Sequence, residues 1–248
     1  MSGKNKIRFG LLGKDIDYSF SKAYFTEKFQ KEKLNHCCYE NFDLADLSNF
    51  KMILQTAQLK GMNVTIPYKQ EVIPFLDNLD EVSKAIGAVN TIVFNKDGTT
   101  TGYNTDYIGF QKNISPMITE KIKAALVLGT GGASKAVVYA LHKMGIGTQY
   151  VSRKKSTNNL TYSDITDIIL KDHKLIVNCT PLGTYPDIFQ KPNLNYEQLT
   201  NDHVLFDLIY NPTETAFIKA GKKAGARTGN GKNMLVVQAE ASWRLWNT

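Results

Sequence analysis

The chain has 248 residues, which suits one large domain or two small ones. Its net charge is +7, but the Lys and Arg residues are dispersed and form no long run, so nucleic-acid binding is not expected. No apolar run is long enough to span a bilayer, no signal-peptide pattern is present, and three cysteines show no metal-ligand spacing. We therefore expect a cytoplasmic protein that binds a small molecule, with no membrane association and no metal.

The first strand is expected at residues 7–13, and an amphipathic helix is expected to follow from Ser19. Ser19 and Ser21 stand at the start of this helix. Hydroxyl groups at a helix start cap free backbone N–H groups, but the same hydroxyl and N–H groups also bind a carboxylate. Both interpretations of the two serines stay open.

A second strand is expected at residues 37–42 and a second helix at 47–57. Residues 61–69 alternate between apolar and polar side chains, as a strand does. The apolar set is Met62, Val64 and Ile66, and the polar set is Asn63 and Thr65, with Lys69 just beyond the strand. This polar face is either the solvent-exposed side of an edge strand or part of a binding site.

Two further strands are expected at residues 88–94 and 100–103, joined by a hairpin turn at 95–98. Asp106 follows directly, before an expected helix over residues 107–114. Its carboxylate is either the N-cap of that helix or an acid directed into a cleft.

Residues 124–145 predict a strand, a glycine-rich turn and a helix. The turn begins at Gly129, and such a turn lets the backbone approach a pyrophosphate that the helix N-terminus binds. Ser134 stands where the usual dinucleotide fingerprint has its third glycine. A tight turn that binds nothing also uses glycine, so the turn alone leaves that alternative open.

The next expected strand, at residues 148–152, ends in Ser152-Arg153-Lys154-Lys155. In a dinucleotide site this strand end lies beside the adenosine ribose, and an Asp or Glu there binds the ribose diol. Three adjacent cations instead favour a ribose 2′-phosphate, so the expected cofactor is NADP. The alternative is a solvated basic loop.

The remaining expected elements are a helix at 163–170, strands at 174–178 and 204–207, and helices at 213–220 and 233–246. Thr180 follows a strand at the edge where open α/β sheets bind ligands. Gln238 is a lone polar residue on an otherwise apolar helix face, so it is either a core amide or a substrate contact.

Together these elements predict an α/β protein of two domains. Residues 1–106 are expected to form a mixed-sheet α/β domain with polar groups at its strand ends, and the family resemblance given next implies that this domain binds substrate and carries out catalysis. Residues 107–229 form a Rossmann-like NADP-binding domain, and the helix within residues 230–248 returns to pack on the first domain.

In this order the motifs make the chain resemble the shikimate dehydrogenase family almost from end to end. The stretches that carry the resemblance are Ser19-Phe20-Ser21, 63–69, 88–91, 104–106, 129–133, 178–183, 207–212, and Met234-Leu235 with Gln238. Each stretch alone is a weak signal, but their joint order is highly specific.

The resemblance implies NADPH-dependent, reversible reduction of 3-dehydroshikimate to shikimate, in the chorismate and aromatic amino acid pathway, by a monomer or homodimer. It implies Lys69 and Asp106 as the catalytic pair. The implied substrate-binding residues are Ser19, Ser21, Asn63, Thr65, Lys69, Asn90, Asp106, Tyr210 and Gln238. The implied cofactor-binding residues are Gly129, Thr130, Gly131, Gly132, Ala133, Ser152, Arg153, Lys154, Thr180, Leu208 and Gly231.

The chain departs from the family pattern at three places. Lys22, Tyr24 and Phe25 replace the usual Pro, His and Asn, Ser152-Arg153-Lys154 replaces Asn-Arg-Thr, and Asn233 replaces a glycine. The alternatives are a quinate/shikimate dehydrogenase that uses NAD or both cofactors, a non-catalytic NADP-binding sensor, and a folate-linked dehydrogenase. The three cations Arg153-Lys154-Lys155 favour NADP over NAD. The presence of both Lys69 and Asp106 disfavours a non-catalytic sensor, and Ser19 with Ser21 suits a small carboxylate better than a folate.

Overall fold

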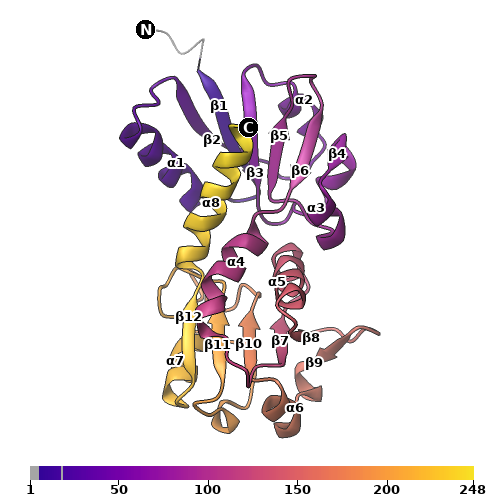
Figure 1. Cartoon of the computed structure of the whole chain (residues 1–248), viewed down its shortest axis with the longest axis vertical. Helices are drawn as coiled ribbons and strands as arrows, with labels where there is room; N and C mark the ends of the chain where they lie inside the picture. The colour runs from indigo at the N-terminus through magenta and orange to yellow at the C-terminus, as the bar shows by residue number, and fades with distance from the viewer. Residues whose placement is uncertain (1–5, 18) are drawn as a thin grey trace. The chain divides into compact units, whose positions relative to one another are not determined.

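The computed structural model describes residues 6–17 and 19–248, and the chain divides into two compact units (Figure 1). Unit 1 comprises Met1–Thr105 and Ala239–Thr248, and unit 2 comprises Asp106–Gln238. Each unit is built on its own six-stranded sheet. The last helix, α8 (Lys232–Trp246), begins in unit 2 and ends in unit 1.

Unit 1 has a mixed sheet with the strand order β2-β1-β3-β5-β6-β4. Its strands are β1 (Ile7–Gly13), β2 (Cys37–Asp43), β3 (Leu59–Val64), β4 (Asn78–Leu79), β5 (Thr91–Phe94) and β6 (Thr100–Tyr103). Strand β1 pairs in parallel with β2 and β3, whereas β5 is antiparallel to β3 and β6. The helices are α1 (Phe20–Lys31), α2 (Phe50–Leu54) and α3 (Glu81–Ile86). The expected mixed α/β sheet is confirmed.

The end of α8 packs into the core of unit 1 through Trp246. This indole is 1% exposed, and its Nε1 donates to the carbonyl of Ile92 at 3.0 Å. Its ring lies 5.0 Å from Phe9 and 5.3 Å from Phe25, measured between centroids. A Cβ atom on Gly61 would lie 2.3 Å from the indole, so β3 needs a glycine where the ring crosses it.

Unit 2 has a parallel sheet with the order β12-β11-β10-β7-β8-β9. Its strands are β7 (Ala124–Leu128), β8 (Gly147–Ser152), β9 (Asn159–Thr161), β10 (Leu175–Asn178), β11 (Val204–Asp207) and β12 (Arg227–Asn230). When the strands are numbered from β7 as 1 and read from the β9 edge, this order is 3-2-1-4-5-6, the order of dinucleotide-binding sheets. The order reverses between β7 and β10. The helices are α4 (Asp106–Ile114), α5 (Gly132–Lys143), α6 (Asp167–Asp172) and α7 (Ala216–Lys223). The expected Rossmann-like fold is confirmed.

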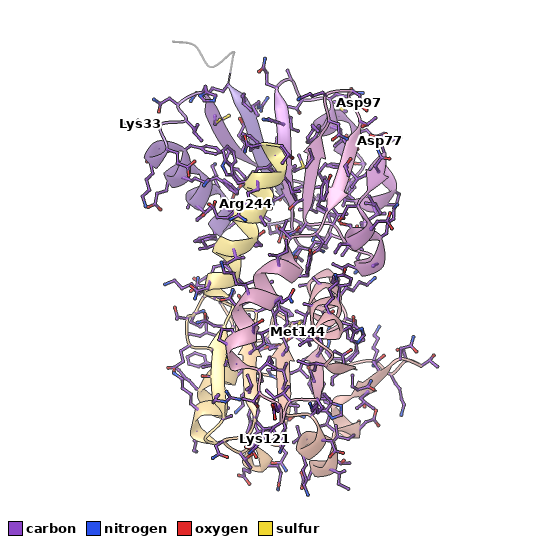
Figure 2. The ribbon with its side chains drawn as sticks, viewed as in Figure 1. Lys33, Asp77, Asp97, Lys121, Met144 and Arg244 are labelled. Carbon is purple, nitrogen blue, oxygen red and sulfur yellow. The ribbon has the colours of Figure 1, made fainter. Side chains whose placement is uncertain are left out.

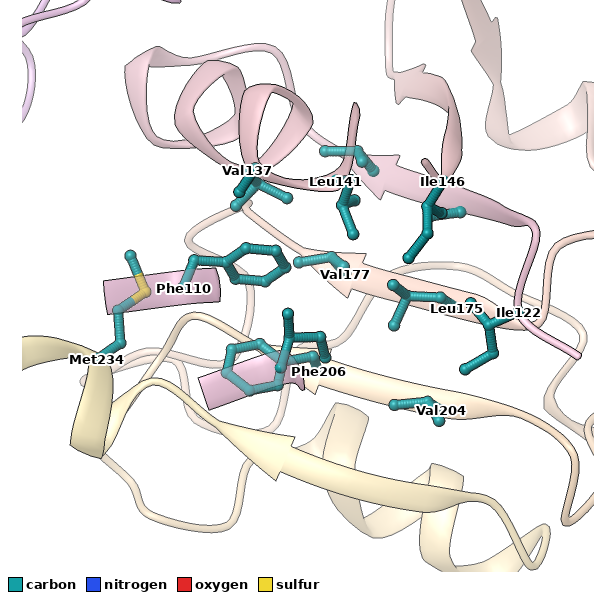
Figure 3. Packing of buried hydrophobic residues seen from close by; sticks show 14 residues of the cluster. Phe110, Ile122, Val137, Leu141, Ile146, Leu175, Val177, Val204, Phe206 and Met234 are labelled. Atoms are coloured by element: carbon teal, nitrogen blue, oxygen red, sulfur yellow. The ribbon is translucent and has the colours of Figure 1, made fainter. Parts of the chain in front are cut away.

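Helices cover the central strands of unit 2, which explains why their sequences are continuously apolar. Residues 125–128 of β7 are all 0% exposed. Figure 3 shows one face of this core, where Phe110 of α4 packs beside Phe206 of β11. These two rings lie 5.4 Å apart at an interplanar angle of 89°.

The helix expected at residues 47–57 is wrong in length, since α2 covers only Phe50–Leu54. Asp46 accepts a hydrogen bond from the backbone N–H of Ser48 at 2.8 Å, which holds the start of this stretch in a turn. Gln58 has a φ of 64°, which is incompatible with a continuing helix.

Capping hydroxyl groups set two helix starts later than expected. Thr166 accepts from the N–H of Ile169 at the start of α6, and Thr215 accepts from the N–H of Ile218 at the start of α7. Both helices therefore begin after a threonine that apolar spacing alone did not mark.

Strand β3 lies between β1 and β5, so the edge-strand interpretation of residues 61–69 is wrong. The strand ends at Val64, and Ile66 is 67% exposed instead of joining the apolar face as expected. Pro67 follows and keeps Ile66 outside the sheet.

The carboxyl group of Asp207 ends β11 in a fully buried position. Its Oδ1 accepts from Asn178 Nδ2 at 3.0 Å and from the Ile209 N–H at 3.1 Å, and its Oδ2 accepts from Thr215 Oγ1 at 2.6 Å. Burial raises the pKa of Asp207 to about 6, although these three hydrogen bonds favour the ionised form.

This raised pKa predicts a loss of stability as pH rises. Between about pH 4 and pH 6 the carboxyl group is ionised in the unfolded chain but still protonated in the folded one. The loss of unfolding free energy is therefore absent below about pH 4 and complete above about pH 6. We therefore compare the unfolding free energies of Asp207→Asn and wild type by urea denaturation. The value for Asp207→Asn minus the value for wild type should increase by about 2–3 kcal/mol between about pH 4 and pH 7, because only the wild type has a carboxyl group that titrates there. A difference between the two proteins that does not change with pH would contradict the raised pKa.

Candidate active site

The candidate residues of unit 1 lie along one edge of its sheet. The parallel strands β1 and β3 end there, and antiparallel β5 begins there, with Thr91 paired to Asn63. The N–H of Thr65 donates to Leu12 O at 2.8 Å, and the N–H of Val64 donates to Asn90 O at 2.8 Å. Segments that are far apart in the sequence thus meet at this edge.

Ser19 is the N-cap of α1, and its hydroxyl accepts from the backbone N–H of Ser21 at 3.3 Å. The capping interpretation of Ser19 is therefore confirmed. Capping does not exclude carboxylate binding, because a hydroxyl that accepts one N–H still has its own proton to donate. The first turn of α1 contains no acidic residue, so the positive end of the helix dipole is not neutralised locally.

Lys69 lies on the turn that follows β3 and is half-buried. Its carbonyl accepts from the N–H of Val89 at 2.7 Å, which fixes this turn beside the start of β5. The neighbouring Tyr68 is 2% exposed and donates its hydroxyl proton to Leu44 O at 2.6 Å. The backbone that carries the Lys69 ammonium is therefore anchored on both sides.

The amide of Asn90 is 2% exposed and closely held. Its Oδ1 accepts from the Thr105 N–H at 2.7 Å, and its Nδ2 donates to Thr105 Oγ1 at 2.9 Å. Asn63 is 4% exposed, with its amide bonded to Tyr39 at 2.8 Å and to Ser242 at 3.0 Å. Asn63 therefore joins its strand to α8 and to β2.

Sequence reasoning missed four residues at this edge, namely Tyr39, Thr91, Thr105 and Ser242. All are buried and hydrogen-bonded to Asn63 or Asn90. The signal that was present is a polar side chain on a largely apolar helix face, such as Ser242 one turn after Gln238 on α8.

Three candidates belong to unit 2. Asp106 is the first residue of α4 and is 5% exposed, so it lies within the helix and is not the preceding cap. Gln238 is 8% exposed, and its Nε2 donates to the Leu235 carbonyl at 3.0 Å. Tyr210 is half-buried in the connection that follows β11.

The glycine turn between β7 and α5 has the shape expected of a phosphate-binding turn. Gly129 has a φ of 103°, and a Cβ atom there would lie 3.2 Å from the carbonyl of Cys179, so the loops after β7 and β10 touch. Gly131 is the N-cap of α5, with no side-chain cap, and Gly132 and Ala133 form the first turn. The helix N-terminus is therefore presented by bare backbone.

Ser134 takes the place of the third glycine of the usual fingerprint. It is 0% exposed, and its Oγ donates to Gly131 O at 2.7 Å. The serine hydroxyl therefore closes the turn from inside, which explains why a non-glycine residue fits there.

A shallow hollow beside this turn is rich in cations. It is lined by Thr130, Ser152, Arg153, Lys154, Lys155, Ser156 and Asn159. These lining residues include three cations and no Asp or Glu. Lys155 lies 3.6 Å from Asp164, so Arg153 and Lys154 are the cations of the hollow that remain for an anion.

The other cofactor candidates follow the neighbouring strands at the same edge of the sheet. Thr180 Oγ1 donates to Asn178 Oδ1 at 2.7 Å, and the N–H of Leu208 donates to Asn178 O at 3.0 Å. A Cβ atom on Gly231 would lie 2.2 Å from the carbonyl of Leu208, so only glycine fits there. With the glycine turn and the cationic hollow, these residues fit a dinucleotide that carries a 2′-phosphate.

Residues 6–17 and 19–248 contain neither a cluster of metal ligands nor a helix that could span a membrane. No group of three or more His, Cys, Asp or Glu side chains is placed to hold a metal ion within this part of the chain. None of the helices described there combines the length and apolar character needed to cross a membrane.

Comparison with known proteins points to one family. The family model described as "Shikimate dehydrogenase substrate binding domain" matches residues 11–92. The "Shikimate dehydrogenase (NADP(+))" of Methanococcus vannielii is 33% identical over 267 residues, which cover 99% of this chain and 93% of that protein.

Two solved structures show the same likeness in three dimensions. Shikimate dehydrogenase from Aquifex aeolicus has a TM-score of 0.87 at 32% identity, covering 100% of this chain and 94% of that one. The enzyme from Thermus thermophilus, solved in complex with NADP(H) and shikimate, has a TM-score of 0.85 at 28% identity, covering 97% and 93%. With identity above 30% along nearly its whole length, the chain belongs to the shikimate dehydrogenase family.

Proposed function

We propose that this chain catalyses the NADPH-dependent, reversible reduction of 3-dehydroshikimate to shikimate, a step in chorismate and aromatic amino acid biosynthesis. The observation that carries the proposal is the gathering of polar residues from three separate segments at one edge of unit 1, in a chain of this family. The residues are Ser19, Ser21, Thr65, Lys69 and Asn90.

In this proposal unit 1 binds the substrate and unit 2 binds NADP. A polyhydroxylated ring acid needs hydroxyl and amide partners in place of an apolar pocket. Ser19 and Ser21 hold the carboxylate at the start of α1, assisted by Tyr210. Thr65, Asn90 and Gln238 address the ring hydroxyl groups, while Asn63 supports them through its bonds to neighbouring elements.

When bound, NADPH supplies the hydride that adds to the ring carbonyl. Negative charge then develops on the carbonyl oxygen, and Lys69 stabilises this oxygen and donates a proton to it. The ammonium group of a lysine side chain offers both a positive charge and a proton to such an oxygen. Asp106 is the carboxylate partner of Lys69 in this chemistry, and solvent restores the lysine proton after each turnover.

Replacement of Lys69 by alanine removes both the positive charge and the proton. We expect Lys69→Ala to lower kcat by roughly 100-fold or more, the scale of a general acid, and to change KM for shikimate much less. The assay follows the absorbance of NADPH. Lys84→Ala is the matched control, because Lys84 is an exposed side chain of α3 that pairs with Glu81, and its loss should leave kcat unchanged. A kcat for Lys69→Ala within a few-fold of wild type would remove Lys69 from the mechanism.

Replacement of Arg153 tests the cofactor assignment. Loss of one charge-assisted contact to a 2′-phosphate should raise KM for NADPH roughly 10-fold or more and leave KM for NADH almost unchanged, because NADH lacks that phosphate. Lys155→Ala should have a smaller effect, since Lys155 is already paired with Asp164. Equal changes in the two KM values for Arg153→Ala would show that Arg153 does not bind the phosphate.

A further inference from the structure

The amide of Asn90 forms a closed ring of hydrogen bonds with three buried hydroxyl groups, those of Thr91, Thr105 and Ser242. We call these four residues the hydroxyl ring. Asn90 is 2% exposed, Thr105 is 1% exposed, and Thr91 and Ser242 are 0% exposed. Ser242 comes from α8, two positions before Arg244, which is labelled in Figure 2. The helix therefore contributes one member of a network otherwise made by residues 90–105.

Four distances define the ring, and the Asn90 amide sets which atom donates in two of its hydrogen bonds. Ser242 Oγ lies 2.7 Å from Thr91 Oγ1, Thr91 Oγ1 donates to Asn90 Oδ1 at 3.0 Å, and Thr105 Oγ1 lies 3.2 Å from Ser242 Oγ. Asn90 Nδ2 closes the ring by donating to Thr105 Oγ1 at 2.9 Å. The amide oxygen only accepts and the amide nitrogen only donates, so Thr91 donates to Asn90 and Asn90 donates to Thr105.

The backbone excludes the flipped amide. The N–H of Thr105 points at Asn90 Oδ1 from 2.7 Å, and a flip would place an NH₂ group against this donor. In the observed arrangement each hydroxyl of the ring gives one proton and accepts at least one. Thr105 Oγ1 also lies 3.2 Å from Asn90 Oδ1, so its proton can go to Asn90 as well as to Ser242.

Ser242 also connects this ring to the other candidate substrate residues. Asn63 Nδ2 donates to Ser242 Oγ at 3.0 Å, and the Tyr39 hydroxyl donates to Asn63 Oδ1 at 2.8 Å. Burial raises the pKa of the Tyr39 phenol, and a side-chain hydrogen bond with Ser21 opposes that rise. A continuous path of hydrogen bonds thus leads from Tyr39 on β2, through Asn63 and Ser242, to the ring that contains Asn90.

We propose that Ser242 is a positioning residue for substrate binding, which acts by holding the Thr91 and Thr105 hydroxyl groups against the Asn90 amide. This inference rests on the proposed function, because it assigns the substrate as the ligand of Asn90. Loss of the Ser242 hydroxyl removes the acceptor of Asn63 and Thr105 and the donor to Thr91. The Thr105 N–H still fixes the donor and acceptor ends of Asn90, but Thr91 and Thr105 lose the hydroxyl group that holds them against the amide, so the position of the amide is less closely fixed.

The test is Ser242→Ala in the full-length chain. We expect KM for shikimate, and the dissociation constant for shikimate measured by calorimetry, to rise roughly 5- to 10-fold, the scale of one buried hydrogen bond. KM for NADPH should stay within a factor of two, and kcat should change less than KM. Thr91→Val removes another hydroxyl of the ring with little change of shape, and it should give the same pattern if Ser242→Ala folds poorly.

Ser83→Ala is the matched control. Ser83 is 0% exposed on α3, and within the described part of the chain its hydroxyl has no hydrogen-bond partner. The same atom is removed from a buried helix of the same unit, so KM for shikimate should not change.

A double variant separates positioning from general stability. In an Asn90→Ala background, Ser242→Ala should cause no further rise in KM, because its effect passes through Asn90. Additive effects, or an unchanged KM for Ser242→Ala in an enzyme that oxidises shikimate, would overturn the inference. A wild-type chain that does not oxidise shikimate at all would instead overturn the proposed function.

Discussion

Both units depend on the same constraint, which is that parallel strands end at a common edge of their sheet. Residues just past the strand ends are brought together there, however far apart they lie in the sequence. In unit 1 this edge gathers the serines that open α1, the Lys69 turn and Asn90. In unit 2 it gathers the glycine turn, the cationic hollow and the residues that follow β10, β11 and β12. The chemistry differs between the units because the side chains at the two edges differ.

The edge of unit 2 selects an anion by charge and by bare backbone. Gly129 lets the loops after β7 and β10 meet where the strand order reverses, and α5 begins without a side-chain cap. Arg153 and Lys154 add positive charge where a diol-binding site would need an acid. The edge of unit 1 works differently, because buried hydrogen bonds orient neutral amides and hydroxyl groups and few charges are involved. Such networks are specific only when every member is satisfied, as in the hydroxyl ring.

Strong local patterns allowed much of the fold to be predicted from the sequence. The apolar run at residues 124–128 and the glycines after it predicted β7 and the start of α5. A strand that is buried on both faces is apolar at successive positions, so its sequence is easily recognised. The helix expected at 47–57 and the core position expected for Ile66 were wrong, because a turn at Asp46 and a proline after Ile66 outweigh apolar spacing. The bonding partner of Ser242 was not predictable, because its bond to Asn63 spans 179 residues of sequence.

The central claim is that these two edges serve one NADP-linked reaction on shikimate. The most direct test measures oxidation of shikimate and of quinate by the wild-type chain, each with NADP and with NAD. The account predicts that shikimate with NADP gives the highest kcat/KM of the four combinations. Faster oxidation of quinate with NAD would assign the chain to quinate metabolism, and no oxidation of either substrate would contradict the account as a whole.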